Sequence, residues 1–167
     1  VRELRTLDYA GLGANSSLLD GGQPAWVRAG HPVTAAVVAP PVGKLSPLRL
    51  RNSIVDAKFV LEHRASPGFA LVDARDAAYF DGVETGGAPE HPHRAGHIAG
   101  AINVPIESLP RFLKKLPKEQ EIVAYCRGPY CMLAYEAVEK LRKKGYRARR
   151  LEEVFPELQA ERLPVEK

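Results

Sequence analysis

The chain has 167 residues and a formal net charge of +4, and 45% of its residues are hydrophobic, 26% charged and 7% aromatic. This composition excludes a disordered chain, a collagen-like repeat and a small domain held together by disulfides. No apolar run reaches the roughly 20 residues of a membrane-spanning helix, and the opening VRELRTLDYA lacks the pattern of a signal or transit peptide. We therefore expect a cytoplasmic protein without a membrane partner.

The two ends of the chain share a weak internal repeat. The identical pairs are Gly13 and Gly145, Leu19 and Leu151, Pro24 and Pro156, Pro32 and Pro164, and Val33 and Val165. Each copy is predicted to contain a helix stopped by glycine, a short strand ending in leucine, a turn, and a short helix near proline. Residues 1–33 are therefore predicted to be the C-terminal remnant of one module, and 47–167 a complete second module. The segment 34–46, with its paired prolines and no helical period, is predicted to be a linker.

Strands and helices alternate along the predicted second module. Ser53 is expected to cap a helix that runs to about His63, and Phe69–Asp73 is an apolar run of strand length. The later predicted elements are a helix over 77–80, a strand over 101–104, a helix over 106–116, a strand over 121–125, a helix over 131–144 and a strand that ends at Leu151. This alternation predicts an α/β fold, an open parallel sheet flanked by helices on both faces.

Two cysteines lie at the end of a predicted strand and the start of the next helix. Cys126 follows the run EIVAY, and Cys131 begins the helix. In an open parallel sheet, ligands bind beyond the carboxyl ends of the strands, where the next helix presents its free N–H groups. These groups and the adjacent Arg127 favour a thiolate, so Cys126 is the candidate nucleophile. The alternative is that Cys126 is only a small buried apolar residue, the commoner fate of a single cysteine.

Three motifs resemble those of the rhodanese family of sulfurtransferases. They are Asp73-Ala-Arg75, the stretch RAGHIAGAINVP that ends at Pro105, and YCRGPYC, which ends at Cys131. Residues 1–105 are similar to tandem thiosulfate or mercaptopyruvate sulfurtransferases. Residues 121–165 are similar to single rhodanese domains fused to regulators of the arsenic-repressor type.

The resemblance implies an enzyme in which the Cys126 thiolate takes the outer sulfur of a small anionic donor, such as thiosulfate, and carries it as a persulfide. A thiol or cyanide would accept the sulfur, and the reaction needs neither a cofactor nor a metal ion. The residues implied in binding the donor or the persulfide are Arg75, Arg127, Gly128, Tyr130 and Cys131. Asp73 and His97 are expected to be structural.

Two further roles are open to Cys131. It could resolve a Cys126 persulfide or sulfenate as an intramolecular disulfide, or it could help Cys126 bind arsenite or a soft metal. Redox or arsenite sensing of this kind belongs to an alternative function, a sensor or binding module of the same fold without turnover. A phosphatase or arsenate reductase of this fold would need arginine six positions after the nucleophile, where this chain has Met132.

Two charged stretches have residue types that occur in binding sites. EHPH at 90–93, together with His97, has the residue types of a zinc site, but His97 belongs to the GHIAGA turn, where a structural hydrogen bond is expected. The basic stretch 140–150 could contact nucleic acid, yet Tyr146 is its single aromatic residue. The helical part of the stretch instead matches a solvated face whose cations complement the C-terminus of the helix. The sequence therefore predicts neither a zinc site nor a nucleic-acid partner.

Overall fold

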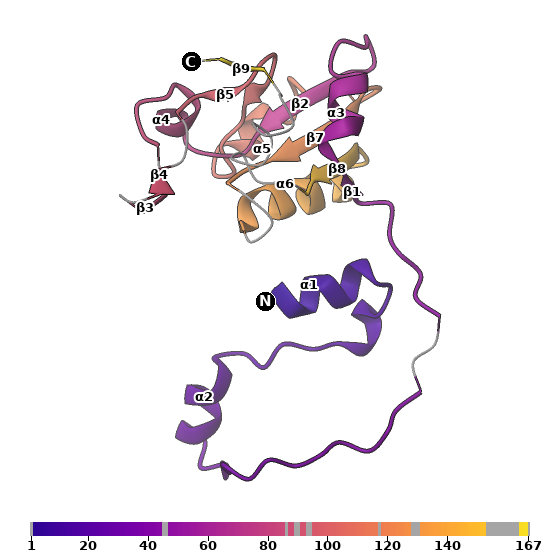
Figure 1. The fold of residues 1–167 in the computed structure, drawn as a ribbon, viewed down its shortest axis with the longest axis vertical. Coiled ribbons are helices and arrows are strands. Elements are labelled where there is room, and N and C mark those ends of the chain that lie inside the picture. Colours follow the sequence, from indigo (N-terminus) through magenta and orange to yellow (C-terminus); the bar gives the residue numbers. More distant parts are fainter. Residues whose placement is uncertain are drawn as a thin grey trace. The chain divides into compact units, whose positions relative to one another are not determined.

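The computed structural model of the chain describes residues 2–44, 47–85, 87–88, 91–92, 95–116, 118–127, 131–152 and 164–166. The chain divides into two compact units, Val1–Arg51 and Asn52–Lys167, whose helices and strands are labelled in Figure 1. The second unit holds all the site residues predicted from the sequence. Among the described helices, none combines the length and the apolar character that crossing a membrane requires.

In its described residues, the second unit is built on a five-stranded parallel sheet. In the spatial order β1-β8-β7-β2-β6, the strands are β1 (Ile54–Val55), β8 (Arg147–Leu151), β7 (Glu121–Tyr125), β2 (Phe69–Asp73) and β6 (Ile102–Asn103). The central strands β2 and β7 run in register, with Asp73 opposite Tyr125. Because neighbouring strands are all parallel, β2, β6 and β7 end at the same edge of the sheet.

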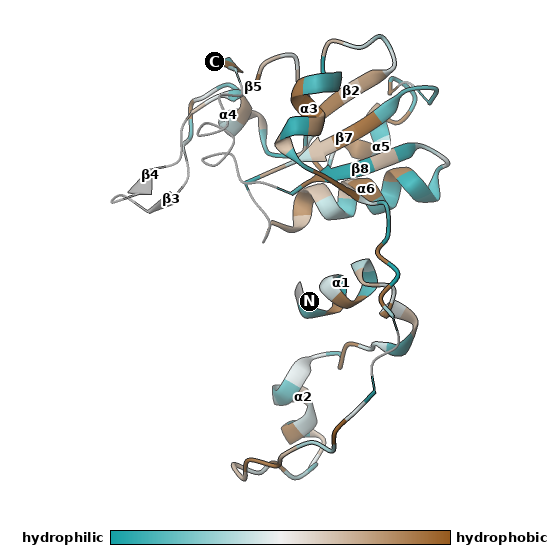
Figure 2. Cartoon of the chain, turned by 45° about the vertical axis from the view of Figure 1, so that its right-hand side comes forward, coloured by the Kyte–Doolittle hydropathy of each residue, from teal (hydrophilic) through white to brown (hydrophobic). Residues whose placement is uncertain are grey.

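Helices cover both faces of this sheet, which confirms the predicted fold class. One face carries α3 (Ala57–His63), and the other carries α6 (Met132–Lys143) and the short α5 (Leu109–Phe112). Successive side chains of a strand point to opposite faces, so β2 and β7, covered on both faces, are apolar except for one charged residue at an end of each. Figure 2 shows these inner strands largely in brown, with teal on the outer sides of the helices.

The start of the second unit differs from the prediction. Ile54–Val55 form the edge strand β1, and α3 begins only at Ala57. Asp56 caps this helix in place of Ser53, because its carboxylate accepts the N–H of Phe59 at 2.8 Å. The carbonyl of Ser53 instead accepts the N–H of Arg150, at 2.8 Å, alongside β8. The predicted cap was wrong because a strand of two residues is fixed by its partner across the sheet and leaves no local pattern.

Other elements keep their predicted type. The helix over 77–80 is present as α4 (Ala77–Phe80), whereas β6 and α5 are shorter than the predicted strand over 101–104 and helix over 106–116. Short strands were not predicted: β3 (Gly87–Ala88), β4 (His91–Pro92), β5 (His97–Ile98) and β9 (Val165–Glu166).

Strands β5 and β9 pair next to Gly96 and bring Glu166 close to its backbone. The two strands are antiparallel, with His97 opposite Glu166. Gly96 has φ of +97°, and a Cβ atom at this position would lie 2.1 Å from the carbonyl oxygen of Glu166. Glycine is therefore required here both by its backbone conformation and by the close approach of β9.

The first unit contains α1 (Arg2–Tyr9), the short 3-10 helix η1 (Gly13–Asn15) and α2 (Gly22–Arg28). Gly11, with φ of +81°, follows α1, just as Gly145, with φ of +83°, follows α6. In both cases the N–H of the next residue bonds back to a leucine carbonyl in the helix, at 2.7 Å after α1 and 3.1 Å after α6. The prediction that Gly13 stops the first helix is therefore wrong, since Gly11 does so.

The strand predicted to end at Leu19 is absent. Leu18 and Leu19 are 59% and 54% exposed, and the described part of the first unit has no strand with which they could pair. The short helix predicted near Pro24 is present as α2, and its counterpart near Pro156 lies outside the described residues. That residues 1–33 are the C-terminal remnant of a separate module stays a prediction.

Residues 31–44 and 47–51 contain neither helix nor strand, and the described part of the predicted linker falls among them. The end of this segment packs on α1 within the first unit. The N–H groups of Arg49 and Arg51 donate to the carbonyls of Ala10 and Tyr9, and Arg51 also pairs with Asp8 at 3.0 Å. The division between the units therefore follows Arg51, later than the predicted boundary at residue 46.

Two basic residues of β8 have acidic partners. Arg149 pairs with Glu121, and its guanidinium lies 4.2 Å from the ring centre of Phe59. Arg150 pairs with Glu152 at 2.6 Å. These pairs neutralise part of the positive charge in the stretch 140–150, and we propose no nucleic-acid partner for it.

Candidate active site

Cys126 lies directly after β7, at the carboxyl edge of the sheet. Its side chain is 4% exposed and packs among apolar residues beneath α6, including Ala124 and Ala134. Cys131 is the capping residue in front of α6, and its sulfur forms a disulfide with Cys126. The two Cα atoms are 6.4 Å apart, within the range that disulfides span in folded proteins. Both sulfur atoms thus lie at the N-terminus of a helix of 12 residues.

Arg127 places a positive charge next to the cysteine pair. Its side chain is exposed, and its guanidinium lies 4.5 Å from the ring centre of Tyr79 in α4. A cation–π contact of this kind orients a guanidinium while its N–H groups stay available for an anion. Donor binding by Arg127 stays a prediction.

Gly128 and Tyr130, which the resemblance assigns to the persulfide-binding loop, lie outside the described residues. The structure describes the two ends of this loop, Cys126 and Cys131, together with Arg127. A cradle of loop N–H groups around the Cys126 sulfur therefore stays a prediction.

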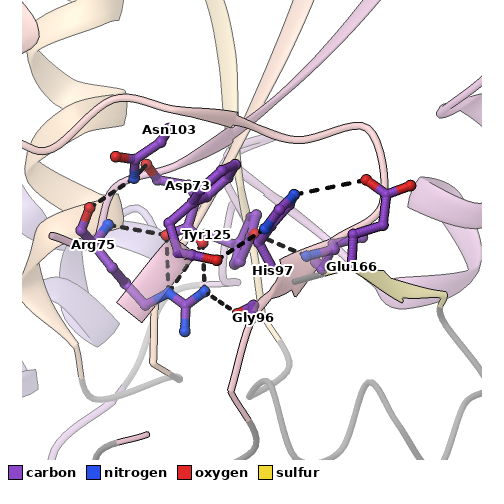
Figure 3. Close-up of polar contacts among 9 residues, drawn as sticks. Asp73, Arg75, Gly96, His97, Asn103, Tyr125 and Glu166 are labelled. Atoms are coloured by element: carbon purple, nitrogen blue, oxygen red, sulfur yellow. Dashed lines mark hydrogen bonds and ion pairs between the residues drawn. The ribbon is translucent and has the colours of Figure 1, made fainter. Parts of the chain in front are cut away.

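Asp73 and Arg75 form a buried ion pair at the end of β2 (Figure 3). The side chains are 0% and 3% exposed, and Nη2 of Arg75 lies 2.6 Å from Oδ2 of Asp73. The Nε of Arg75 donates to both carboxylate oxygens, and its backbone N–H donates to Oδ1 at 3.0 Å. Burial alone would lower the pKa of Arg75, but the bonded Asp73 carboxylate outweighs it and raises that pKa. Arg75 is therefore held in its charged form and is paired with Asp73.

Arg75 connects β2 to two other segments. Its Nη2 also donates to the carbonyl of Gly96 at 2.8 Å, and its own carbonyl accepts a hydrogen bond from Nδ2 of Asn103 at 2.9 Å. The bonds to Asp73 and Gly96 hold the guanidinium at the edge of the sheet. The sequence did not predict these bonds. Asp73 pairs with Arg75 there, and the assignment of Asp73 as structural stays a prediction. Contact between Arg75 and an anionic donor stays a prediction.

Tyr125, the last residue of β7, is a buried part of this framework that was not predicted from the sequence. Its ring centre lies 5.8 Å from the guanidinium carbon of Arg75, and its Oη accepts the N–H of Ile98 at 3.1 Å. Burial and the neighbouring Asp73 carboxylate raise the pKa of Tyr125 well above its usual value of 10.0. The sequence did carry a signal for this role, a tyrosine at the end of an apolar strand. A buried tyrosine hydroxyl needs a hydrogen-bond partner, so contacts with neighbouring segments could be expected.

Tyr125→Phe is expected to destabilise the domain by about 1–3 kcal/mol, because it leaves the buried N–H of Ile98 without a partner. Below pH 10.0 the native chain keeps the full contribution of this hydroxyl. Above that pH the unfolded chain releases the proton that the folded chain retains, so the contribution falls as the pH rises. Urea unfolding at a series of pH values should show the two proteins converging above pH 10.0. A gap that stays constant on both sides of that value would contradict the raised pKa.

His97 links α4 to β9 through contacts on both sides of its ring. The ring stacks on Phe80 with centres 3.6 Å apart, and Nδ1 lies 2.9 Å from the Phe80 carbonyl oxygen. Nε2 lies 3.6 Å from Oε2 of Glu166, a contact drawn in Figure 3. The contacts join three segments of the domain, and the structural role expected of His97 stays a prediction.

In the part of the chain that the structure describes, no three His, Cys, Asp or Glu side chains lie together as a candidate metal site. Glu90 and His93 belong to the EHPH stretch, which has the residue types of a zinc site, and both lie outside the described residues.

In open parallel α/β domains, ligands bind beyond the carboxyl ends of the strands, and Cys126 lies at that edge, between a central strand and the following helix. The family model of the rhodanese-like domain matches residues 56–161, within the second unit. The chain therefore belongs to the rhodanese family, a family of sulfurtransferases, as the motifs indicate.

The relatives include a transcriptional regulator and a thiosulfate sulfurtransferase. The HTH-type transcriptional regulator Rv0324 of Mycobacterium tuberculosis is 43% identical over 107 residues, which cover 64% of this chain and 42% of the regulator. The thiosulfate sulfurtransferase of Gallus gallus is 33% identical over 106 residues, which cover 64% of this chain and 34% of that protein. The chain thus spans less than half the length of these two curated relatives.

A solved structure shows the same fold. The BH2092 protein of Bacillus halodurans superposes with a TM-score of 0.55 at 27% identity, covering 68% of this chain and 76% of that protein. Since the matched share of this chain is close to the size of its second unit, the likeness supports the fold of the cysteine-bearing domain.

Proposed function

We propose that the second unit transfers a sulfane sulfur from thiosulfate, or a similar small anionic donor, to a thiol or to cyanide through a persulfide on Cys126. The observation that carries the proposal is the position of Cys126 between the central strand β7 and the N-terminus of α6. Membership of the rhodanese family and a relative named thiosulfate sulfurtransferase support this class of reaction. The cytoplasm is the compartment that we propose for it.

In the first half-reaction, the reduced Cys126 thiolate attacks the outer sulfur of thiosulfate. A bond forms between Sγ and that sulfur, the sulfur–sulfur bond of thiosulfate breaks, and sulfite leaves with its electron pair. Negative charge thus passes through a site at the N-terminus of α6, and Arg127 directly follows Cys126 in the chain. Both features favour an anion there, and the neighbouring ion pair of Asp73 holds the sheet edge in place.

In the second half-reaction, a thiolate or cyanide attacks the outer sulfur of the persulfide. The bond between the two sulfurs breaks, and Cys126 leaves as the thiolate that began the cycle. The cysteine is regenerated without a change in the oxidation state of the protein, so the proposed cycle needs no cofactor. The Cys126–Cys131 disulfide must be reduced before a cycle can begin.

The alternative is a sensor that uses the two cysteines for redox or arsenite sensing without turnover. The disulfide and the regulator among the relatives are compatible with it. The disulfide does not favour it, however, because a transferase with a second thiol at the site forms the same bond. We therefore retain the sensor as an outcome of the test.

The test is an assay of the reduced full chain with thiosulfate and cyanide. We expect thiocyanate to accumulate well beyond the amount of protein present. If no thiocyanate forms beyond the background reaction, while arsenite binds and removes both thiols from titration, the chain is a sensor and the proposed transfer is wrong.

Arg127→Ala is expected to raise the KM for thiosulfate about tenfold with a smaller effect on kcat. A hydrogen bond to a charged group is worth roughly 1.5–3 kcal/mol, and the exposure of Arg127 places its contribution at the low end. Steady-state kinetics with varied thiosulfate measure the effect. The matched control is Arg64→Ala, an exposed arginine after α3, which should leave the KM unchanged. Equal KM values for both variants would remove Arg127 from the donor site.

A further inference from the structure

The disulfide between Cys126 and Cys131 indicates a second fate for the carried sulfur. We propose that the domain also releases sulfide: the Cys131 thiolate attacks the Cys126 persulfide, forms the intramolecular disulfide and expels the outer sulfur. A dithiol reductant then restores both thiols. This activity rests on the proposed function, because it begins from the Cys126 persulfide.

The disulfide in the structure is the bond that this step would form. Starting from the persulfide, a bond between Sγ of Cys126 and Sγ of Cys131 forms only if Cys131 attacks the inner sulfur. The Cα atoms are 6.4 Å apart, so the folded backbone accommodates the product. Attack at the outer sulfur would instead move the persulfide to Cys131 and leave no disulfide.

Burial gives Cys131 an advantage over acceptors in solution. Cys126 is 4% exposed, and Cys131 packs against the same apolar cluster beneath α6. An external acceptor must first enter this site, whereas the Cys131 sulfur is already within bonding reach. An intramolecular nucleophile in a suitable orientation has a high effective concentration, so it competes well with a dissolved thiol.

The helix start favours the reactive form of Cys131. This residue is the capping position of α6, where the first N–H groups of the helix lack partners within the helix. No side chain bond from Cys131 caps these groups, which therefore favour an anion at that place. The thiolate is the nucleophilic form of cysteine, so this position suits Cys131 as an attacking group.

The atoms and electrons of the step balance without an added oxidant. The bond between the two cysteine sulfurs forms, the bond between Cys126 Sγ and the outer sulfur breaks, and that sulfur leaves as hydrosulfide with the electron pair. The two protein thiols are oxidised, and the transferred sulfur is reduced to sulfide. Over a full cycle, thiosulfate and a dithiol become sulfite, sulfide and a disulfide.

The test is a single turnover of the reduced chain without an acceptor. The reductant is removed, thiosulfate is added under anaerobic conditions, and released sulfide and intact protein mass are both measured. We expect the native chain to release one sulfide per chain and to become lighter by two hydrogen atoms. Cys131→Ser and Cys131→Ala should release no sulfide and should become heavier by one sulfur atom on Cys126.

The outcomes separate this inference from the proposed function. A native chain that keeps the added sulfur on Cys126 as stably as the variants, or that carries it on Cys131, would overturn the inference and leave the transfer reaction standing. If neither the native chain nor the two variants gain sulfur or release sulfide, the persulfide does not form and both proposals fail.

Discussion

Cys126→Ser is expected to reduce thiocyanate formation from thiosulfate and cyanide to the uncatalysed background. A serine hydroxyl is not ionised at neutral pH and cannot carry a sulfane sulfur, so both half-reactions lose their central atom. The variant differs by a single atom at a position that is 4% exposed. The thiosulfate–cyanide assay measures the loss, with circular dichroism to show that the variant is folded.

Cys126→Ala is the matched control for the effect of a buried hydroxyl. Placing an unpaired hydroxyl in an apolar site costs about 1–3 kcal/mol, whereas alanine has no polar group to satisfy. The alanine variant should therefore be as inactive as the serine variant and at least as stable. Turnover by either folded variant would show that another residue carries the sulfur.

Asp73→Asn is expected to destabilise the domain by about 3–5 kcal/mol, the largest stability effect that the structure predicts. The substitution leaves the Arg75 guanidinium, only 3% exposed, without its carboxylate partner. Because single domains are stable by only about 5–15 kcal/mol, a large part of the total would be lost. Urea unfolding monitored by circular dichroism measures the change.

Asp76→Asn provides the control for the loss of a carboxylate from the same segment. Asp76 is exposed, and its side chain makes no capping bond to α4. Its replacement should change the free energy of unfolding by no more than about 0.5 kcal/mol. If the two substitutions had the same effect, the buried pair would not stabilise the end of β2.

The central strands could be predicted because they obey a local rule. Phe69–Asp73 and Glu121–Tyr125 are apolar except for one charged residue at an end of each, as expected of strands covered on both faces, and the structure has them with the predicted bounds. Helix α6 was predicted for a similar reason, since its apolar residues repeat at helical spacing and Gly145 allows the helix to stop.

The elements that were missed depend on partners far away in the sequence. In β1, Ile54 pairs with Arg150, and in β5, His97 pairs with Glu166. Two residues carry no detectable period, so neither strand has a local signal. The same principle explains the absent strand at Leu19, because an apolar pattern produces a strand only where another strand accepts its hydrogen bonds.

The sequence predicted the position of the candidate nucleophile, but it did not predict the buried polar contacts around it. The position of Cys126 follows from the strand before it and the helix after it, both of which have local patterns. The motif named Asp73 and Arg75 but gave no indication that the two side chains pair in the interior. The hydrogen bond between Tyr125 and Ile98 likewise appears only when β7 meets β5, and the bond between Asn103 and Arg75 only when β6 lies beside β2.

The central claim, that Cys126 carries the sulfur, is tested most directly by following the outer sulfur of labelled thiosulfate. Reduced Cys131→Ser is incubated with the donor, desalted, and digested under conditions that preserve persulfides. The account predicts that the label is on the peptide containing Cys126. Label on a different peptide, or on no peptide of the folded chain, would contradict it.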